Sequence, residues 1–423
     1  MGHKAMYSGD KTVEVKAPII LWGVEASPYQ LKMQALLDGA GLAWQRWPDQ
    51  GTPWAARRMA WRIRRARGRR TIDRFPGMDW NLDEYPAVPY YSFDGRTFRY
   101  DSSSLALELD QRKLGKQPLL PIDPAQQFLA LLIDEAFDEF GLYMVHHKRW
   151  VDSAATNVMG TVTAAEMRHL FPLGLRHLAA RQLPRRQSHR CPYLFSVAPE
   201  GFDAGVEPTR TPPAREGFPP THALLNQAWE ECLAAMEWAL WHRPYLLGDH
   251  FSLADASAYG QLGMNLVDGV TAERLRELAP RTYDWLVAIQ GHRLQELAPP
   301  ARGGDSEGAG PHQESSDDRA GDLRPLLEWA NRYFIPLMVQ NEQAFEEKQE
   351  QGATLFNEAA FDRGDALYNG ELNGHRYRSV VKTFQVKVWR DLRAAWQVLP
   401  EESRHYLEGL NCLDTGALNE AIP

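Results

Sequence analysis

Cysteine is scarce in this sequence, and long apolar runs are missing. The three cysteines among 423 residues, Cys191, Cys232 and Cys412, lie far apart and form no disulfide or metal-binding pattern. We therefore expect reduced thiols and a cytoplasmic location. No apolar run approaches the roughly 18 residues of a membrane helix, and the first residues have no apolar segment typical of a secretory signal. The sequence therefore predicts no contact with a membrane. No cluster of histidines and carboxylates has the spacing of metal ligands, so no metal is predicted either.

An excess of positive charge is lacking too. The 47 basic and 55 acidic side chains give a net charge of −8, and this balance does not favour nucleic acid or an anionic membrane as partner. Hydrophobic residues make up 44% of the chain and charged residues 24%, which is typical of a globular protein. The length indicates two or three domains.

The N-terminal part predicts a strand, a helix and a second strand. The apolar run IILWGV, residues 19 to 24, is typical of a buried strand. Pro28 suits the first turn of a helix, where its missing N–H costs nothing, and Gly39 and Gly41 end that helix. LAWQRW, residues 42 to 47, predicts the next strand.

A hairpin and a helix are predicted further on. AVPYYSF (87 to 93), the turn Asp94-Gly95 and RTFRY (96 to 100) form a hairpin pattern. A helix then begins at Asp101 or Ser102, either of which can cap it.

From about residue 122 the pattern is helical. Long amphipathic segments alternate with a Pro-, Arg- and Gly-rich stretch, residues 181 to 220, that predicts a loop. We expect the C-terminal hundred residues to fold either as a small domain or as helices packed on the main body. The predicted units are a first domain, a helical domain, a linker and a helical extension, at residues 18–115, 122–298, 299–322 and 323–423.

Three motifs offer places for chemistry. Ser27 precedes Pro28 at a strand-to-helix turn, where a hydroxyl and the positive end of a helix favour an anion; alternatively it only caps the helix. If the Val88-Pro89 bond is cis, the Val88 backbone can pair with an extended ligand; the commoner alternative is a trans proline. Asp101-Ser102 offers a helix start to a carboxylate, or caps that helix.

In this order the motifs resemble the thioredoxin-like domain of the glutathione S-transferase family. A C-terminal match supports this: RPYLLGDHFSLADASAYGQL resembles the segment "yL.Gd.fSlADa" of the family, with Ser252 and Asp255 as a capping box. The resemblance covers residues 18–115 and 122–292, and the remainder looks like the extension of long bacterial members. It implies an α/β thioredoxin-like N-terminal domain followed by an all-α glutathione-transferase C-terminal domain with extra C-terminal helices.

The resemblance also implies site residues. Ser27 matches the catalytic residue that activates the thiol of glutathione, and the glutathione-binding positions are Tyr29, Val88, Pro89, Asp101 and Ser102. Gln30 stands where a dithiol protein has its second cysteine, so redox chemistry is not expected. A homodimer and a role in detoxification are further family expectations.

Two segments extend or depart from that pattern. Residues 51 to 75 are dense in arginine, with Trp54 and Trp61 between the arginines. They predict either a bound anion or a solvated basic helix that meets an acidic surface of this chain or of a partner subunit. VHHKRW, residues 145 to 150, ends the helix expected to line the electrophile pocket, so His147 and Arg149 are candidate pocket residues; alternatively they complement the helix dipole.

The leading hypothesis is a transferase in which Ser27 holds a glutathione thiolate for attack on an electrophilic small molecule. A second hypothesis is a non-catalytic scaffold or regulator that binds a protein partner. The third is a glutathione-dependent lyase, etherase or isomerase.

Overall fold

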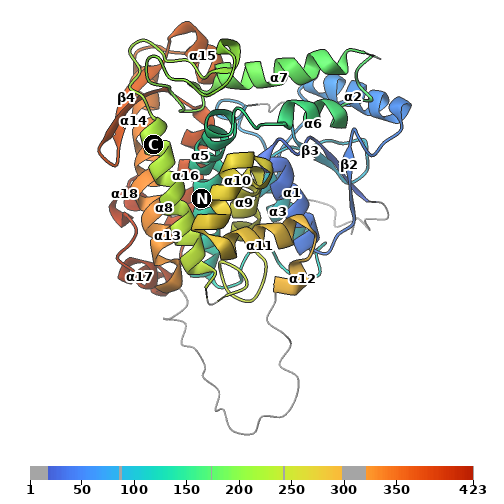
Figure 1. Ribbon diagram of the computed structural model, residues 1–423. Coiled ribbons are helices and arrows are strands. Elements are labelled where there is room, and N and C mark those ends of the chain that lie inside the picture. The colour runs from blue at the N-terminus through green and yellow to red at the C-terminus, as the bar shows by residue number, and fades with distance from the viewer. Residues whose placement is uncertain (1–17, 85–87, 173, 242, 298–320, 423) are drawn as a thin grey trace.

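The computed structural model describes residues 18–84, 88–172, 174–241, 243–297 and 321–422. Its N-terminal part contains a small sheet in the order β2-β1-β3, with β1 (Ile19–Trp22) parallel to β2 (Trp44–Trp47) and antiparallel to β3 (Tyr90–Ser92). The helices of this part, coloured from blue to cyan in Figure 1, are α1 (Pro28–Gly39), α2 (Pro53–Gly68) and α3 (Ser102–Gln111).

The two faces of this sheet pack against different elements. Ile19 and Leu21 of β1 join the main core with residues of α1 and α3, whereas Trp22 and Tyr90 pack with Met59 of α2 in a smaller cluster. The alternation along the strands therefore places α2 on one face and the rest of the protein on the other.

The predicted hairpin is present in shortened form. Its second arm pairs with β3 only through Tyr91 and Arg99, whose backbone groups exchange hydrogen bonds of 2.8 and 2.9 Å. Asp94 holds the turn, because its carboxylate accepts hydrogen bonds from the backbone N–H groups of Arg96 and Thr97.

The helical part begins with a long run from residue 124 to residue 152 that includes two π-helical turns. It consists of α4 (Pro124–Ala136), η1 (Phe137–Gly141), α5 (Leu142–His147) and η2 (Lys148–Asp152). The helices that follow are α6 (Met159–Glu166), α7 (Arg176–Arg190), α8 (His222–Ala239), α9 (Leu253–Leu262), α10 (Gly269–Leu278), α11 (Pro280–Gln290) and α12 (Leu294–Leu297), with 3-10 turns η3 (Pro208–Arg210) and η4 (Gly263–Val267). None of the helices in the described ranges is both long and apolar enough to span a bilayer.

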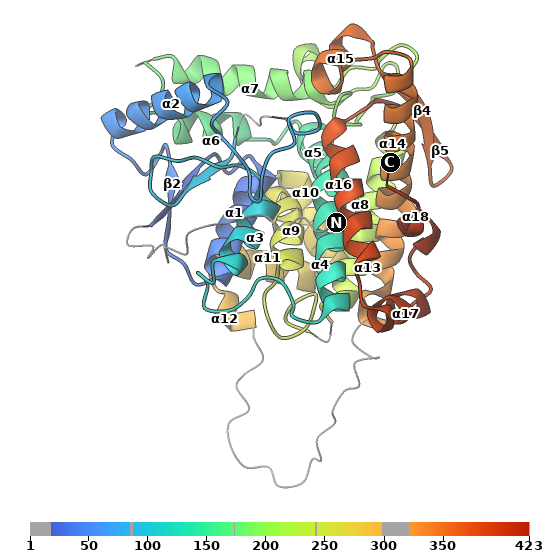
Figure 2. The same ribbon diagram turned by 180° about the vertical axis from the view of Figure 1, so that it is seen from behind.

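The C-terminal region packs against the main body. Its elements are η5 (Gly321–Leu323), α13 (Arg324–Trp329), η6 (Ala330–Phe334), α14 (Ile335–Glu350), α15 (Asn357–Arg363), β4 (Leu367–Leu372), β5 (His375–Val380), α16 (Thr383–Gln397), α17 (Glu401–Gly409) and α18 (Thr415–Asn419). Figure 2 shows α16 beside α4, and Trp396 of α16 packs on Phe128 of α4 with ring centroids 5.2 Å apart. One apolar core includes residues of the sheet, the helical part and this region.

These elements confirm the predicted fold class, a small α/β N-terminal part followed by helices. The capping box at the start of α9 is also present: Asp255 accepts hydrogen bonds from the backbone N–H and the hydroxyl of Ser252. The domain boundaries remain predictions, and the linker expected at 299–322 lies outside the described residues except for its last two.

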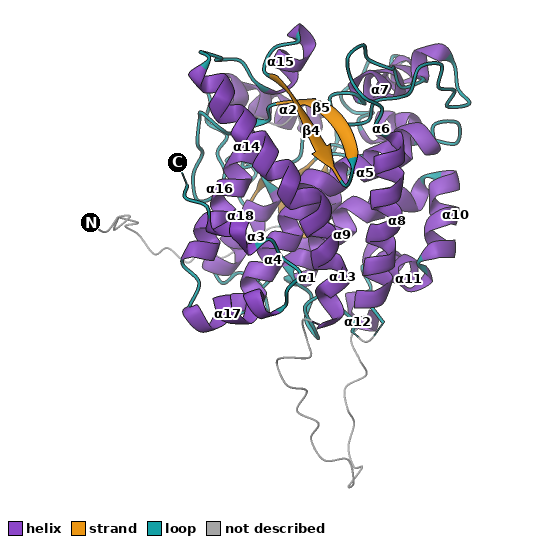
Figure 3. Cartoon of the chain, turned by 90° about the vertical axis from the view of Figure 1, so that its left-hand side faces the viewer, coloured by secondary structure: helices purple, strands orange, loops and turns teal. Residues whose placement is uncertain are grey.

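Two expectations were wrong. The stretch from 181 onward continues α7 as far as Arg190, in spite of Pro184 inside that helix, so only its later part is a loop. The C-terminal region is not purely helical, because β4 and β5 form the hairpin drawn in orange in Figure 3. Its turn, Asn373-Gly374, has positive φ at both positions, as a two-residue hairpin turn requires.

A buried ion cluster joins the N-terminal and helical parts. Lys32 of α1 is 1% exposed, and its ammonium lies 2.5 Å from a carboxylate oxygen of Asp134 and 2.6 Å from one of Asp138. Its third hydrogen bond, 2.8 Å long, reaches the hydroxyl of Ser103 in α3. Burial raises the pKa of Asp138 to about 7, although the nearby ammonium opposes this. The cluster therefore fixes α1 and α3 against the long helix.

Replacing Lys32 tests how much this cluster contributes to the free energy of unfolding. Lys32→Met leaves two carboxylates buried without their cation, and we expect the free energy of unfolding to fall by about 3–5 kcal/mol. Urea denaturation measures this. Lys116→Met, at an exposed lysine, is the control and should change stability by less than about 0.5 kcal/mol. Equal stability of the two variants would mean that the cluster does not hold the two parts together.

Candidate active site

Ser27 lies at the start of α1, and its hydroxyl forms no hydrogen bond with the residues that the structure describes. Its backbone is extended, and its carbonyl oxygen accepts hydrogen bonds from the N–H groups of Gln30 and Leu31 at 3.1 and 3.2 Å. The side chain is half-buried and makes no capping hydrogen bond. Ser27 thus occupies the cap position without using its hydroxyl there, so the alternative of simple side-chain capping is not observed.

Val88 and Pro89 lie at the same end of the sheet as Ser27. The register pairs Trp22 with Tyr90, so Pro89 lies beside Gly23, at the beginning of the turn that leads to Ser27. A Cβ added to Gly23 would approach the Cβ of Pro89 to 3.1 Å and would collide with the side chain of Gln30. The Val88-Pro89 bond is cis, which differs from the commoner trans form that the sequence left as the alternative.

Asp101 and Ser102 begin α3. Asp101 has a φ of 78°, and its carboxylate accepts a 3.0 Å hydrogen bond from the N–H of Ser104. A non-glycine residue with such a φ is strained and is held by its surroundings. Here Asp101 does cap its helix, and Ser102 is buried. A role for the pair in ligand binding stays a prediction.

Tyr29 faces the helical part instead of solvent. Its hydroxyl donates a 3.0 Å hydrogen bond to the carbonyl oxygen of Asp138 in η1. Burial, followed by the negative charge of Glu139, raises the pKa of Tyr29 well above its usual value. The hydroxyl therefore docks α1 onto the long helix, and its expected contact with glutathione stays a prediction.

Glu139 is an acidic residue that sequence analysis missed. It lies in η1 and is 7% exposed, and burial together with the charge of Asp138 raises its pKa to about 8. Glu139 is close enough to Tyr29 and to Asp101 for their charges to interact, so it neighbours the starts of both α1 and α3. The available signal was the run DEAFDEF, residues 134 to 140, in which two acidic pairs interrupt an apolar helix segment.

Lys382 approaches the same helix from the C-terminal region. It is 7% exposed, its ammonium donates a hydrogen bond to the hydroxyl of Tyr143, and it lies 4.3 Å from the centre of that ring. Gln385 donates to the same hydroxyl at 2.8 Å. Burial lowers the pKa of Lys382 to about 7, although the negative charge of Glu139 opposes this.

Lys382 differs from the other buried lysines of the described chain. An ion pair with a carboxylate is formed by each of Lys32, Lys148 and Lys387. In the described chain, no carboxylate lies within ion-pair distance of Lys382. A buried ammonium without a paired carboxylate is costly. Lys382 and Glu139 thus supply two groups that change protonation near neutral pH beside the helix that holds α1.

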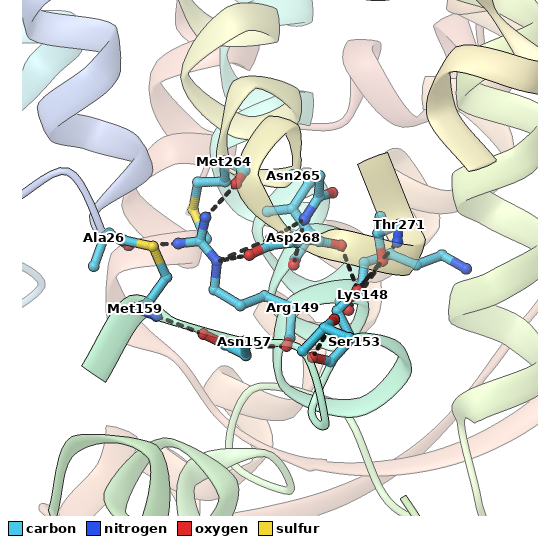
Figure 4. Close-up of polar contacts among 12 residues, drawn as sticks. Ala26, Lys148, Arg149, Ser153, Asn157, Met159, Met264, Asn265, Asp268 and Thr271 are labelled. Carbon is cyan, nitrogen blue, oxygen red and sulfur yellow. Dashed lines mark hydrogen bonds and ion pairs between the residues drawn. The ribbon is translucent and has the colours of Figure 1, made fainter. Parts of the chain in front are cut away.

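His147 and Arg149 are both buried. His147 is fully buried, with its Nδ1 2.9 Å from the hydroxyl of Ser196. Arg149 is 1% exposed, and its Nε lies 2.9 Å from the carboxylate oxygens of Asp268, as Figure 4 shows. Its Nη1 donates to the carbonyl oxygen of Ala26 at 3.3 Å. Arg149 therefore braces the residue before Ser27, and its contact with substrate stays a prediction.

The arginine-rich segment is largely α2, and it is solvent-exposed. Trp54 and Trp61 are 69% and 57% exposed, and the guanidinium groups of Arg58 and Arg65 lie over their rings at 5.2 Å. Within the described residues, no arginine from 57 to 70 forms an ion pair with a carboxylate. The segment is thus a solvated basic helix, but it meets no acidic surface in the described part of this chain.

In that part, no group of three or more acidic, His or Cys residues is arranged to hold a metal ion.

A scan against protein-family models finds no match, and neither does a search of curated proteins. Among solved structures, this chain is similar to glutathione S-transferases. The β-etherase LigF from Sphingobium sp. strain SYK-6 is 16% identical, with 66% of this chain and 98% of that chain covered and a TM-score of 0.39. A glutathione S-transferase of Ceriporiopsis subvermispora in complex with glutathione is 14% identical, with 67% and 100% covered and a TM-score of 0.39.

A third such structure is a glutathione S-transferase from Methylobacterium radiotolerans in complex with glutathione sulfonate. It is 16% identical, with 69% of this chain and 100% of that chain covered and a TM-score of 0.34. With TM-scores this low, the likeness assigns no reaction to this chain.

The Arg149–Asp268 pair can be tested by a double replacement. Arg149→Met leaves the carboxylate of Asp268 buried and unpaired, so we expect a loss of about 3–5 kcal/mol in the free energy of unfolding. Adding Asp268→Asn removes that charge and should restore part of the loss. Urea denaturation of the three proteins measures both steps. A double variant less stable than Arg149→Met would contradict a paired-charge role.

Lys382 predicts a specific dependence of stability on pH. Its pKa is lowered on folding from 10.5 to about 7, so between these values the unfolded chain binds more protons and stability rises with pH. Lys382→Met abolishes this contribution. From pH 7 to pH 9 the wild-type protein should therefore gain on the order of 2 kcal/mol relative to the variant. Denaturation at both pH values measures the difference, and Lys348→Met is the control. A constant difference would show that Lys382 keeps an ordinary pKa.

Proposed function

We propose that this protein is a glutathione-dependent transferase. The Ser27 hydroxyl donates a hydrogen bond to the sulfur of bound glutathione, lowers the pKa of that thiol and holds the thiolate. The thiolate then attacks an electrophilic carbon, and a C–S bond forms. In a displacement, a leaving group departs with its electron pair. In an addition, the electrons of a multiple bond move to another atom of the substrate. The observation that carries the proposal is the Ser27 hydroxyl, which lies at the start of α1 and does not cap that helix.

The neighbourhood of Ser27 supports the proposal. The positive end of α1 favours an anion by a few tenths to about 1 kcal/mol. Val88 lies beside the turn before Ser27 and offers backbone groups for a peptide-like ligand. Asp101 and Ser102 provide a second helix start for the other end of glutathione. Glu139 and Lys382 support proton transfer near neutral pH, because burial has moved the pKa values of both towards that range.

A second candidate function is a non-catalytic protein that binds a partner. The exposed tryptophans of α2 favour it, together with arginines of α2 that form no ion pair with a carboxylate in the described residues. A third is a lyase, etherase or isomerase that uses glutathione. Release of a glutathione conjugate distinguishes a transferase from an enzyme that returns glutathione unchanged. The natural electrophile, the homodimer and the cytoplasmic location belong to the proposal as family expectations.

Calorimetric titration with glutathione at two salt concentrations separates the first two candidates. Binding in the micromolar to low-millimolar range supports an enzyme that uses the Ser27 site. Absence of binding by a protein that still melts cooperatively favours the partner-binding protein.

Replacement of Ser27 tests the mechanism. In Ser27→Ala the thiolate loses one hydrogen bond, so turnover of an activated aryl halide should fall by about one to two orders of magnitude. Stability should change by less than about 0.5 kcal/mol, since the hydroxyl caps no backbone group. Thr52→Ala is the matched control, because it removes a cap that Thr52 does make to Ala55 and should cost about 1 kcal/mol without affecting turnover. Unchanged turnover in Ser27→Ala removes Ser27 from the mechanism.

A further inference from the structure

Two basic helices lie at the same end of the molecule. α2 and α7 are both at the top in Figure 1 and in Figure 2. Arg57 of α2 donates a 3.0 Å hydrogen bond to the carbonyl oxygen of His169, in the segment that leads to α7. The mechanism proposed for Ser27 uses neither helix, so their composition calls for another explanation.

Charge is distributed unevenly between these helices and the rest of the chain. Residues 51–72 and 167–199, which contain α2 and α7, hold fourteen arginines, no lysine and no acidic residue. All 55 acidic residues therefore lie outside these two segments. The net charge of −8 describes the chain as a whole, and it hides a separation of charge with its positive end at α2 and α7.

α2 exposes tryptophans on the face opposite its core contacts. Its buried side chains, which follow one another at spacings of three and four residues, are Ala56, Met59 and Ile63. A second stripe, with spacings of four, three and four residues, consists of Trp54, Arg58, Trp61 and Arg65. At about 100° per residue, the two stripes lie on opposite sides of the helix. The packing of α2 on the sheet therefore leaves both tryptophans in solvent.

α7 adds further cations and exposed apolar side chains. Two of its arginines pair with carboxylates. Three others are exposed and form no ion pair with a carboxylate in the described residues, namely Arg176, Arg181 and Arg186. Leu175 and Leu178, at the start of the helix, are 46% and 56% exposed. Both helices thus combine arginine with large apolar side chains on their solvent side.

We infer that α2 and α7 together bind the surface of an anionic phospholipid membrane, so that the protein is held at the membrane without crossing it. The planar guanidinium groups form paired hydrogen bonds with lipid phosphates. The rings of Trp54 and Trp61 lie at the level of the headgroups, between the wet and the apolar layers. Leu175 and Leu178 reach the beginning of the acyl chains.

The composition of this surface favours a membrane over two other anionic partners. Nucleic acid offers phosphates to arginine and bases that stack on tryptophan, but it has no apolar layer for Leu175 and Leu178. A second copy of this acidic chain offers carboxylates, but it must also present apolar groups at positions that match two tryptophans and two leucines. A bilayer presents phosphates above a continuous apolar layer everywhere on its surface.

The separation of charge also sets the orientation of the protein at the membrane. The negative surface potential attracts the end with α2 and α7 and repels the acidic remainder, and both effects fall off within a Debye length. Because the sheet covers the buried face of α2, the stripe with Trp54 and Trp61 is the side that meets the lipid. Binding therefore requires no rearrangement of the fold.

Flotation of the full chain with lipid vesicles tests this inference. The wild-type protein should bind vesicles of phosphatidylcholine mixed with phosphatidylserine, and it should not bind vesicles of phosphatidylcholine alone. Added salt should weaken the binding, because it screens the attraction between arginines and headgroups.

Removal of arginines tests the electrostatic part. In Arg58→Gln combined with Arg65→Gln, affinity for the mixed vesicles should fall by at least about tenfold, because each arginine near the surface adds to the attraction. Arg276→Gln combined with Arg281→Gln, in α10 and α11, is the matched control. It removes the same charge, and Arg281 also lies over an exposed tryptophan, Trp241, at 3.8 Å. The control should bind like the wild type.

Removal of tryptophans tests the apolar part. Trp54→Ser combined with Trp61→Ser keeps every charge, but affinity for the mixed vesicles should again fall by at least about tenfold, because the rings no longer enter the interface. Trp238→Ser combined with Trp241→Ser, at two tryptophans of similar exposure, is the matched control and should bind like the wild type.

The outcomes that overturn the inference are distinct. One is a cooperatively melting wild-type protein that does not bind the mixed vesicles. Another is equal affinity of either variant and its control. Tighter binding of a single-stranded oligonucleotide than of the mixed vesicles, in the same buffer, replaces the membrane with nucleic acid. Salt-sensitive self-association without vesicle binding replaces it with a second copy.

A further variant keeps the test decisive if the arginine variant of α2 does not fold. Arg181→Gln combined with Arg186→Gln changes two exposed side chains of α7, and it should lower the affinity for mixed vesicles in the same way. Unchanged affinity there also overturns the inference. None of these results depends on glutathione, so they leave the proposed function to its own tests.

Discussion

The buried ammonium of Lys32 is the interaction on which the arrangement of the two parts depends. It takes its compensation from Asp134 and Asp138 on the long helix, and these carboxylates also accept hydrogen bonds from Ser257 and Gln261 of α9. A charge in a low-dielectric interior tolerates little displacement of its partners. The start of α1 is therefore fixed relative to η1. The turn that carries Ser27 is held in one position by this contact.

The long helix acts on the site through its π-helical turns. A π turn inserts one residue into the helical repeat and changes which side chains face inward beyond it. In η1 this brings the backbone of Asp138 to Tyr29 and places Glu139 near the start of α3. In η2 it turns Arg149 towards Ala26 and Asp268. Both turns thus direct polar groups of one helix at the segment around Ser27.

Local signals predicted the elements better than the site. The apolar run before Ser27, Pro28 at the helix start and the Ser252–Asp255 box each act within a few residues, and each is found where the sequence placed it. The Asn373-Gly374 turn was equally readable and was overlooked. The sequence could not show that Glu139 and Lys382 lie near each other. These residues are far apart in the chain, and only the packing of the core brings them together. The burial of Arg149 could not be predicted for the same reason, because it depends on a pair with Asp268 that no local pattern indicates.

The packing of Trp396 on Phe128 has a consequence for synthesis. A ribosome makes α4 long before α16, so the ring of Trp396 that covers Phe128 is added much later. Until then the apolar face of α4 that α16 will cover has no partner from its own chain, and exposed apolar surface on incomplete chains is prone to aggregation. Translation speed and chaperone binding while the chain between α4 and α16 is made should therefore affect how much protein reaches the native state.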